Sequence, residues 1–265
     1  MNDERTFEEL LLAARGLDEE DEAFWDIVWL LSERGDHETF DKAIALTRSE
    51  AFERSFAASI LGRFGAGIEA PERPFSAEIV DRLLQMLRVE QDENVLSDVV
   101  SALGNQVQDP RIPLALQGLN THPLEALRWN LALTLSHYET PESIKMLLDL
   151  TRDSSSDVRD WATFGLGTQC DLDTPAIRAA LLERLNDEDE DTRAEAIFGL
   201  AKRHDRRVIA AIQRDFDAGF SGALLFQAIL ETPDASLLAS LKAMAQNPNF
   251  PPDEDIEAAI AACEA

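Results

Sequence analysis

The sequence is poor in basic residues, histidine, cysteine and tyrosine for its length of 265 residues. It has 24 Lys and Arg against 51 Asp and Glu, which gives a net charge of −27 at pH 7 with histidine neutral. Proteins that bind nucleic acid neutralise phosphates with Lys and Arg, and anionic membranes attract the same side chains. The shortage of cations therefore argues against nucleic acid or a membrane as a partner. A basic protein would instead be attracted by the acidic surface.

Cysteines and long apolar segments are also scarce. The two cysteines, Cys170 and Cys263, stand apart from any CxxC pair or Cys/His cluster, which argues against a disulfide framework or a structural zinc site. No apolar run approaches the roughly 20 residues of a membrane span. The first residues, MNDERTFEELLLAARG, carry acids where a signal peptide carries basic residues. We therefore expect reduced thiols and a cytoplasmic location.

The motifs of common catalytic and cofactor sites are missing from the sequence. It has no GxSxG, GxxxxGK[ST], GxGxxG or HExxH pattern. The acidic run from Asp187 to Asp191 lacks the glycine and the ligand alternation of an EF-hand loop. We expect this run to solvate a turn and to place negative charge at the start of the next helix. No catalytic residue, metal ion or cofactor is predicted, and an enzymatic role stays open only through an alternative given below.

What the sequence does contain is a repeat. The stretch DVRDWATFGLG, residues 157–167, returns 34 residues later as DTRAEAIFGLA, residues 191–201, and looser copies precede it. Apolar residues of the first copy recur at helical spacing, and a period of about 30 to 45 residues built from paired helices is typical of an α-solenoid. The five copies share an anchor position, occupied by Arg54, Leu96, Arg128, Arg159 and Arg193. We expect the arginines to form a polar ladder between repeats.

Capping signals and internal glycines support this interpretation. Thr140-Pro141 and Thr174-Pro175 have the chemistry of helix starts, since Thr caps a free N–H and Pro suits the first helical position. Asp109-Pro110 and Thr232-Pro233 predict two further starts in the same way. Glycine inside a helix costs about 1 kcal/mol relative to alanine. We therefore expect Gly165 and Gly199 to mark places where a neighbouring backbone comes close.

These residues resemble the HEAT-repeat family, whose first helix reads roughly D-x-x-V-R-x-x-A-x-x-A-L-G. Asp157, Arg159, Leu166 and Gly167 match that pattern, although the spacing before Val and Arg is one residue shorter and Leu96 replaces one arginine. The resemblance is best over 94–215. It implies an all-α fold, a right-handed α-solenoid of about six HEAT-like helix pairs forming a single domain over 1–265. The segments 1–49 and 252–263 are expected to supply N-terminal capping helices and a C-terminal capping helix.

Two enzyme classes built on such scaffolds find little support in the residues. Deoxyhypusine hydroxylase holds two irons through several His-Glu pairs, whereas this chain has one such pair, His37-Glu38, and we expect His37 to cap a helix start. HEAT-like DNA glycosylases cradle DNA on a basic face. The only basic island here is Lys202, Arg203, Arg206 and Arg207, and we expect these charges to favour a helix C-terminus.

The sequence thus predicts a non-enzymatic protein-interaction module that binds a basic protein, with an immunity-type protein that neutralises a toxin as one version. The alternative is a HEAT-repeat lyase or chaperone-like protein of the bilin-lyase type. By resemblance, second helices line the concave face, so Glu142, Asp149 and Glu183 are candidate partner-binding residues, together with Trp129. Trp25 and Trp29 are expected in the core at the open end of the stack. The oligomeric state stays open.

Overall fold

The structure is a computed structural model that describes residues 5–65, 73–106, 109–247 and 254–265. Within these ranges every regular element is a helix, so the predicted all-α class is confirmed. The chain divides into two compact units, residues 1–134 and 135–265, and each is described by itself. Every helix in the described ranges is too short or too polar to span a membrane.

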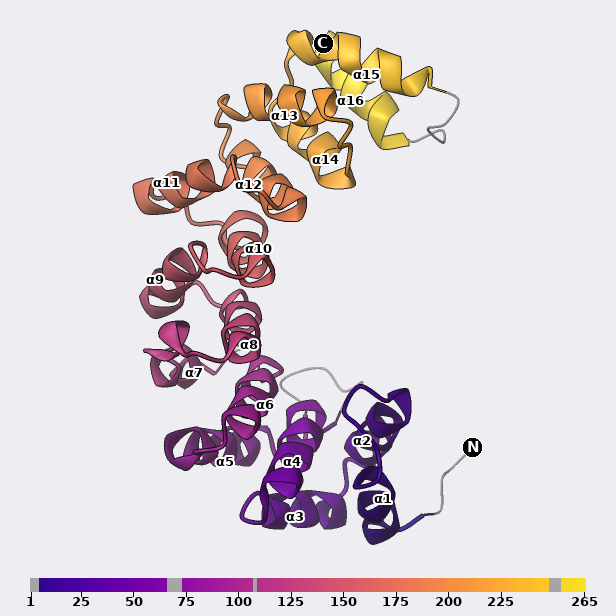
Figure 1. The fold of residues 1–265 in the computed structure, drawn as a ribbon, viewed down its shortest axis with the longest axis vertical. Helices are drawn as coiled ribbons and strands as arrows, with labels where there is room; N and C mark the ends of the chain where they lie inside the picture. Colours follow the sequence, from indigo (N-terminus) through magenta and orange to yellow (C-terminus); the bar gives the residue numbers. More distant parts are fainter. Residues whose placement is uncertain (1–4, 66–72, 107–108, 248–253) are drawn as a thin grey trace. The chain divides into compact units, whose positions relative to one another are not determined.

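The first unit consists of short helices joined by turns. Its elements are α1 (Phe7–Ala14), α2 (Glu22–Arg34), α3 (His37–Leu46), α4 (Ala51–Arg63), α5 (Ser76–Val89), α6 (Glu93–Gly104), α7 (Arg111–Ala115), the 3₁₀ turn η1 (Leu119–Thr121) and α8 (Glu125–Leu135), which ends at the division. The helices α2, α4 and α6 lie side by side in one layer, and α3 and α5 pack against that layer (Figure 1). The helix pairs predicted near the N-terminus are therefore present.

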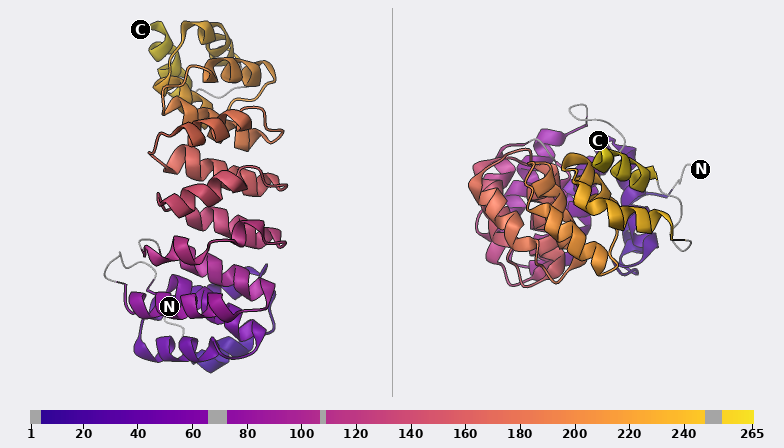
Figure 2. Two further views of the ribbon diagram at one scale, coloured as in Figure 1. Left: turned by 90° about the vertical axis from the view of Figure 1, so that its left-hand side faces the viewer. Right: turned by 90° about the horizontal axis from the view of Figure 1, so that it is seen from above.

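The second unit repeats this arrangement. Its elements are α9 (Pro141–Leu150), α10 (Ser156–Phe164), the π-helical turn η2 (Gly165–Gln169), α11 (Pro175–Arg184), α12 (Glu190–Ala201), α13 (Val208–Asp217), α14 (Ala223–Glu231), the 3₁₀ turn η3 (Ala235–Leu237), α15 (Leu238–Ala245) and α16 (Glu254–Glu264). One layer contains α10, α12, α14 and α16, and the odd-numbered helices pack against it. Figure 2 shows the helices of each unit stacked as successive rungs.

The predicted capping threonines behave as expected in two of the three cases. Thr140 and Thr174 accept the N–H groups of Ser143 and Ile177, both at 3.2 Å, at the starts of α9 and α11. Thr232 was predicted to cap in the same way, and this is wrong. It follows α14, and its hydroxyl donates to the Ala201 carbonyl at 3.2 Å. The cap of η3 comes instead from a carboxylate two residues later, which accepts a backbone N–H.

Of two other expected helix starts, one uses a neighbouring residue and one uses the predicted carboxylate. His37 is the first residue of α3, and Asp36 caps this helix by accepting the Thr39 N–H at 2.8 Å. The His37 ring instead meets the Phe75 ring edge-on, with centroids 4.6 Å apart. At Asp109-Pro110 the carboxylate accepts the Arg111 N–H at 2.9 Å, immediately before α7. Asp36 thus caps α3, whereas Asp109 bonds the first N–H of α7 from one residue before its N-cap position, which Pro110 occupies.

The layer of even-numbered helices is held together by small residues. A Cβ atom added to Gly199 on α12 would lie 2.4 Å from the Cα of Gly167 on η2. A Cβ on Gly62 of α4 would lie 2.8 Å from the Cα of Ala102 on α6. Gly165 is more loosely surrounded: a Cβ there would lie 3.1 and 3.2 Å from side-chain atoms of Ser136 and Leu147 and 3.3 Å from the Cα of Ser136. A neighbouring backbone therefore comes close at both glycines, and the approach is tighter at Gly199.

Candidate functional site

Three of the repeat arginines close the turns that precede their own helices. Each donates to two backbone carbonyls five and six residues upstream, where the turn leaves acceptors without helical partners. The distances are 2.8 and 3.1 Å from Arg128 to His122 and Pro123, 3.1 and 3.3 Å from Arg159 to Asp153 and Ser154, and 2.9 and 3.1 Å from Arg193 to Asp187 and Glu188. Arg54 makes one bond of this kind, 2.8 Å to the Ser49 carbonyl.

Three of the anchor arginines also reach a carboxylate, which follows the next helix for Arg54 and Arg159 and lies within α13 for Arg193. Arg159 donates to both oxygens of Asp187 at 2.8 and 2.9 Å, and both side chains are buried. Arg54 makes the matching pair of bonds to Glu90 at 2.8 and 2.9 Å. Arg193 lies 3.4 Å from Asp215. These positions therefore hold turns and successive helix pairs together, and offer little to a partner.

The acidic run 187–191 is only partly the solvated turn that the sequence predicts. Asp189 caps α12 by accepting the Thr192 N–H at 2.8 Å, which agrees with negative charge at that helix start. Asp187 is instead buried. Burial raises the pKa of Asp187, but hydrogen bonds from Arg159 and from the Asp189 N–H outweigh it and lower that pKa below its ordinary value.

The basic island is also an internal structure. Arg203 is only 8% exposed, and burial lowers its pKa. Its guanidinium donates to carbonyl oxygens at the end of η2 and on α12, those of Leu166, Gly167, Cys170, Leu172 and Gly199, at 2.7 to 3.2 Å. Arg207 donates a hydrogen bond to Asp205, and Arg206 forms an ion pair with Asp234. The island therefore caps a helix end, as the sequence predicts, and its exposed arginines already pair with acids.

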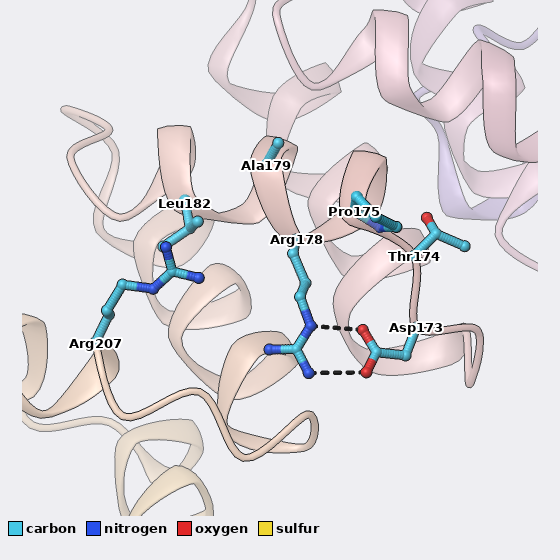
Figure 3. Close-up of a pocket in the computed structure, with 7 residues that line it drawn as sticks. All are labelled: Asp173, Thr174, Pro175, Arg178, Ala179, Leu182 and Arg207. Atoms are coloured by element: carbon cyan, nitrogen blue, oxygen red, sulfur yellow. Dashed lines mark hydrogen bonds and ion pairs between the residues drawn. The ribbon is translucent and has the colours of Figure 1, made fainter.

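A pocket of about 460 Å³ lies beside this island, between α11 and Arg207 (Figure 3). Its wall is partly apolar, and Arg178 donates to Asp173 at 2.6 and 2.8 Å. Arg178 also reaches Asp205 at 3.1 Å. The hydrogen bond from Arg207 is the main reason why the pKa of Asp205 falls to about 2. Arg178 and Arg207 both already donate to carboxylates, so we expect the pocket to bind an anion only weakly.

The predicted partner-binding residues belong to different units. Trp129 is half-buried on α8 in the first unit, whereas the three acids belong to the second unit. Glu142 is half-buried and Asp149 exposed on α9. Glu183 on α11 is exposed, but it accepts two hydrogen bonds from Arg152, both at 2.9 Å. Of the three acids, Glu183 is therefore already neutralised by a neighbour.

The layer that carries these acids also differs from the expectation. In the second unit α10, α12, α14 and α16 pack closely against one another, while α9 and α11 touch only slightly. The closely spaced layer of a curved stack lies on its inner side. Within this unit the first helices therefore form the inner layer, and α9 and α11 form the outer one.

The repeats carry a second set of equivalent contacts, which the sequence pattern did not single out. Each contact joins two successive even-numbered helices. The residue directly after the anchor of the first helix meets the residue two positions after the anchor of the second. At α4 and α6 the hydroxyl of Ser55 donates to Asp98. At α6 and α8 the amide of Asn130 donates to Ser97 at 3.0 Å. Each of these contacts pairs a donor with an acceptor.

The equivalent positions of α10 and α12 carry two acids, Asp160 and Glu195, and the charge of Glu195 acts on Asp160. Both side chains are half-buried. The Oδ1 atom of Asp160 is buried without a hydrogen-bond partner among the described residues. Burial, followed by the charges of Glu195 and of nearby aspartates, raises the pKa of Asp160 to about 7. Burial also raises the pKa of Glu195, although the hydroxyl of Thr168 donates to it at 2.5 Å.

Comparison with known proteins identifies the architecture. Residues 80–167 match the family model of HEAT repeats. This part of the chain therefore consists of HEAT repeats. The fold of the chain is similar to that of YibA from Escherichia coli, with 24% identity, a TM-score of 0.77, and coverage of 98% of this chain and 93% of that one. An engineered protein shares 17% identity, with a TM-score of 0.60 and coverage of 97% and 78%. No curated protein sequence matches the chain.

The match supports the α-solenoid class predicted from the repeat, and HEAT repeats suggest a scaffold for protein interactions. Human deoxyhypusine hydroxylase shares 17% identity over 97% of this chain and 96% of its own, but the TM-score is only 0.36. That value is too low to relate the two folds in detail. The interaction role rests on the HEAT repeats.

The raised pKa values of two half-buried acids predict an unusual dependence of stability on pH. Burial raises the pKa of both Asp98 and Asp160 from 3.8 to about 7. The folded state therefore binds more protons than the unfolded state between these values, so stability falls as the pH rises toward 7 and levels off above it. After allowance for solvent screening, we expect the melting temperature to drop by about 4 °C between pH 6 and pH 8.

Calorimetry of the wild type and of the double variant Asp98→Asn, Asp160→Asn tests this prediction. The variant keeps the shape of both side chains and removes the titrating groups. Its melting temperature should change much less between pH 6 and pH 8. An equal drop in both proteins would show that other groups cause it.

Proposed function

We propose that this HEAT-repeat protein is a non-enzymatic interaction module that binds a basic protein through its acidic surface. The excess of 51 acids over 24 basic residues carries the proposal. A surface of this sign accelerates encounter with a basic partner and disfavours acidic ones. One concrete version is an immunity-type protein that neutralises a cationic toxin.

Ion pairs and hydrogen bonds inside the fold increase the excess of negative charge at the surface. Basic side chains already have partners within the fold. Arg159 pairs with Asp187, Arg178 pairs with Asp173, and Arg203 donates to backbone carbonyls. Exposed acids such as Asp149, Asp157 and Asp191 remain at the surface of the second unit. Glu142, Asp149, Glu183 and Trp129 stay candidate contacts of this wider surface.

Capture from native lysate at two salt concentrations tests the proposal. Immobilised protein should retain a basic protein at about 50 mM salt and lose most of it at about 500 mM, where the Debye length is short. As a control, an acidic protein of similar size that lacks HEAT repeats should retain a different set. Capture of an acidic partner, or capture that is indifferent to salt, would contradict recognition led by charge.

A further inference from the structure

A pocket of about 590 Å³ lies between α1 and α2, which pack against each other in the first unit (Figure 1). We call it the α1–α2 pocket. Because α1 has 8 residues and α2 has 13, α1 is about 8 Å shorter and covers only part of its neighbour. Five lining residues share one face of α2, namely Ala23, Asp26, Ile27, Leu30 and Glu33.

The inside of the pocket is largely apolar. Leu17, in the turn after α1, and Leu30 are half-buried, and Ile27 is buried. Trp29 also lines the pocket and is 45% exposed, so the expectation that it lies in the core is wrong. The guanidinium of Arg63 lies 5.8 Å from the centroid of this ring and helps to hold the indole in place. Exposed tryptophans beside a pocket are common anchors of protein interfaces.

Two acids lie on the wall of the pocket itself. Asp26 and Glu33 are exposed, and their carboxylates form no hydrogen bond or ion pair with the described residues. Arg5 also lines the pocket, so the wall carries two negative charges and one positive charge. Both carboxylates are therefore accessible to a cation from outside.

A run of five acids borders the same pocket. Residues 18–22 connect Leu17 to Ala23, which both line it, and all five acids are exposed. The indole of Trp25 donates to the Glu19 carbonyl at 2.8 Å, which holds this segment against α2. The pocket thus has an apolar floor and an acidic border, as in protein interfaces with an apolar core and a polar rim.

The charges around the pocket favour one occupant over another. A second copy of the chain would bring the acidic border against a molecule of net charge −27, and like charges brought together in an interface are costly. A basic segment is attracted by the same border. Asp26 and Glu33 lie about 10 Å apart along the axis of α2, which is also the spacing of two lysines seven residues apart in another helix.

We propose that the α1–α2 pocket binds a basic amphipathic helix of the protein partner. The apolar side chains of that helix enter the pocket beside Trp29 and Leu30. Its lysines or arginines pair with Asp26, Glu33 and the run 18–22. Amphipathic helices bind apolar grooves of other proteins in this way. This assignment rests on the proposed function, and it names where on the acidic surface the partner docks.

Calorimetric titration with a blocked peptide of about 14 residues tests the docking. The peptide has leucines along one helix face, lysines seven residues apart beside them, and alanine elsewhere. Asp26→Asn with Glu33→Gln should weaken its binding by about fivefold, because two exposed ion pairs are lost. The control Asp41→Asn with Glu78→Gln removes the same charge from exposed positions of α3 and α5 and should change the affinity by less than about twofold.

A second pair of variants tests the apolar floor. Leu30→Asn should weaken binding of the same peptide by about tenfold, because a leucine in the pocket can no longer pack against an apolar side chain. Leu114 on α7 is 61% exposed and does not line the pocket, so Leu114→Asn should leave the affinity unchanged. Circular dichroism checks that each variant is folded. If Leu30→Asn does not fold, the two acid pairs decide.

A peptide of the same composition, with leucine and lysine mixed around the helix, separates docking from attraction by charge alone. It should bind the wild type at least about fivefold more weakly. Equal binding of the two peptides, equal weakening by the two acid pairs, or no weakening by a folded Leu30→Asn would overturn the docking site. Sedimentation that shows a wild-type dimer, lost in Leu30→Asn, would overturn it in favour of a second copy.

The docking site and the wider function fail in different ways. If Asp26→Asn with Glu33→Gln and Leu30→Asn both capture the salt-sensitive basic protein from lysate as well as the wild type does, the proposed function stands and the docking site is wrong. If the wild type captures no basic protein, the proposed function itself fails.

Discussion

Replacing Arg203 by methionine is expected to lower the free energy of unfolding by about 4 kcal/mol. Arg203 is buried, and its guanidinium donates to carbonyls that the π-helical turn η2 leaves without helical partners. Methionine keeps the apolar stem but leaves these carbonyls without donors. Because several buried carbonyls lose their donor at once, we expect this substitution to be among the most destabilising single changes in the chain.

Urea unfolding of Arg203→Met measures this loss, and a neighbour in the same island supplies the control. Arg206 is mostly exposed and pairs with Asp234 at the surface. Arg206→Met should therefore cost less than about 0.5 kcal/mol. If the two variants lose similar stability, Arg203 does not hold the end of η2 in the way that its hydrogen bonds indicate.

Replacing Arg159 by methionine is expected to cost about 3 kcal/mol, because it leaves Asp187 buried with a weaker set of partners. Arg184 still donates to Asp187 at 3.0 Å, which limits the loss. The substitution also removes the bonds from Arg159 to the Asp153 and Ser154 carbonyls. Both effects loosen the connection between α10 and the turn that follows α11.

A double-mutant cycle with Asp187→Asn separates the ion pair from the turn. The two substitutions together should cost less than the sum of the single losses, because the second removes a charge that the first leaves unpaired. Strict additivity, measured by urea unfolding of the three variants, would contradict a direct interaction between Arg159 and Asp187.

The helices and their pairing could be predicted from the sequence because local signals agree. Proline and threonine mark the starts of α9 and α11, and the apolar spacing of 157–167 fits one face of a helix. Where two capping residues stand close together, the choice between them depends on geometry. Asp36 rather than His37 therefore caps α3, and Asp234 rather than Thr232 caps η3.

The candidate site was not predicted because its signal lies in differences between repeats. Asp160 and Glu195 occupy unremarkable polar positions in a chain rich in acids. Aligning the position next to each anchor pairs Ser55 with Asp160. How deeply Asp160 is buried, and which charges act on it from the next helix, follow only from coordinates.

The affinity of the captured partner for the purified protein, measured by calorimetry at low and high salt, tests the central claim most directly. The claim is that an acidic HEAT-repeat surface binds a basic protein. We expect the partner to be basic and its affinity to fall by at least about tenfold between about 50 and about 500 mM salt. An acidic partner, or an affinity that stays constant over this range, would contradict the claim.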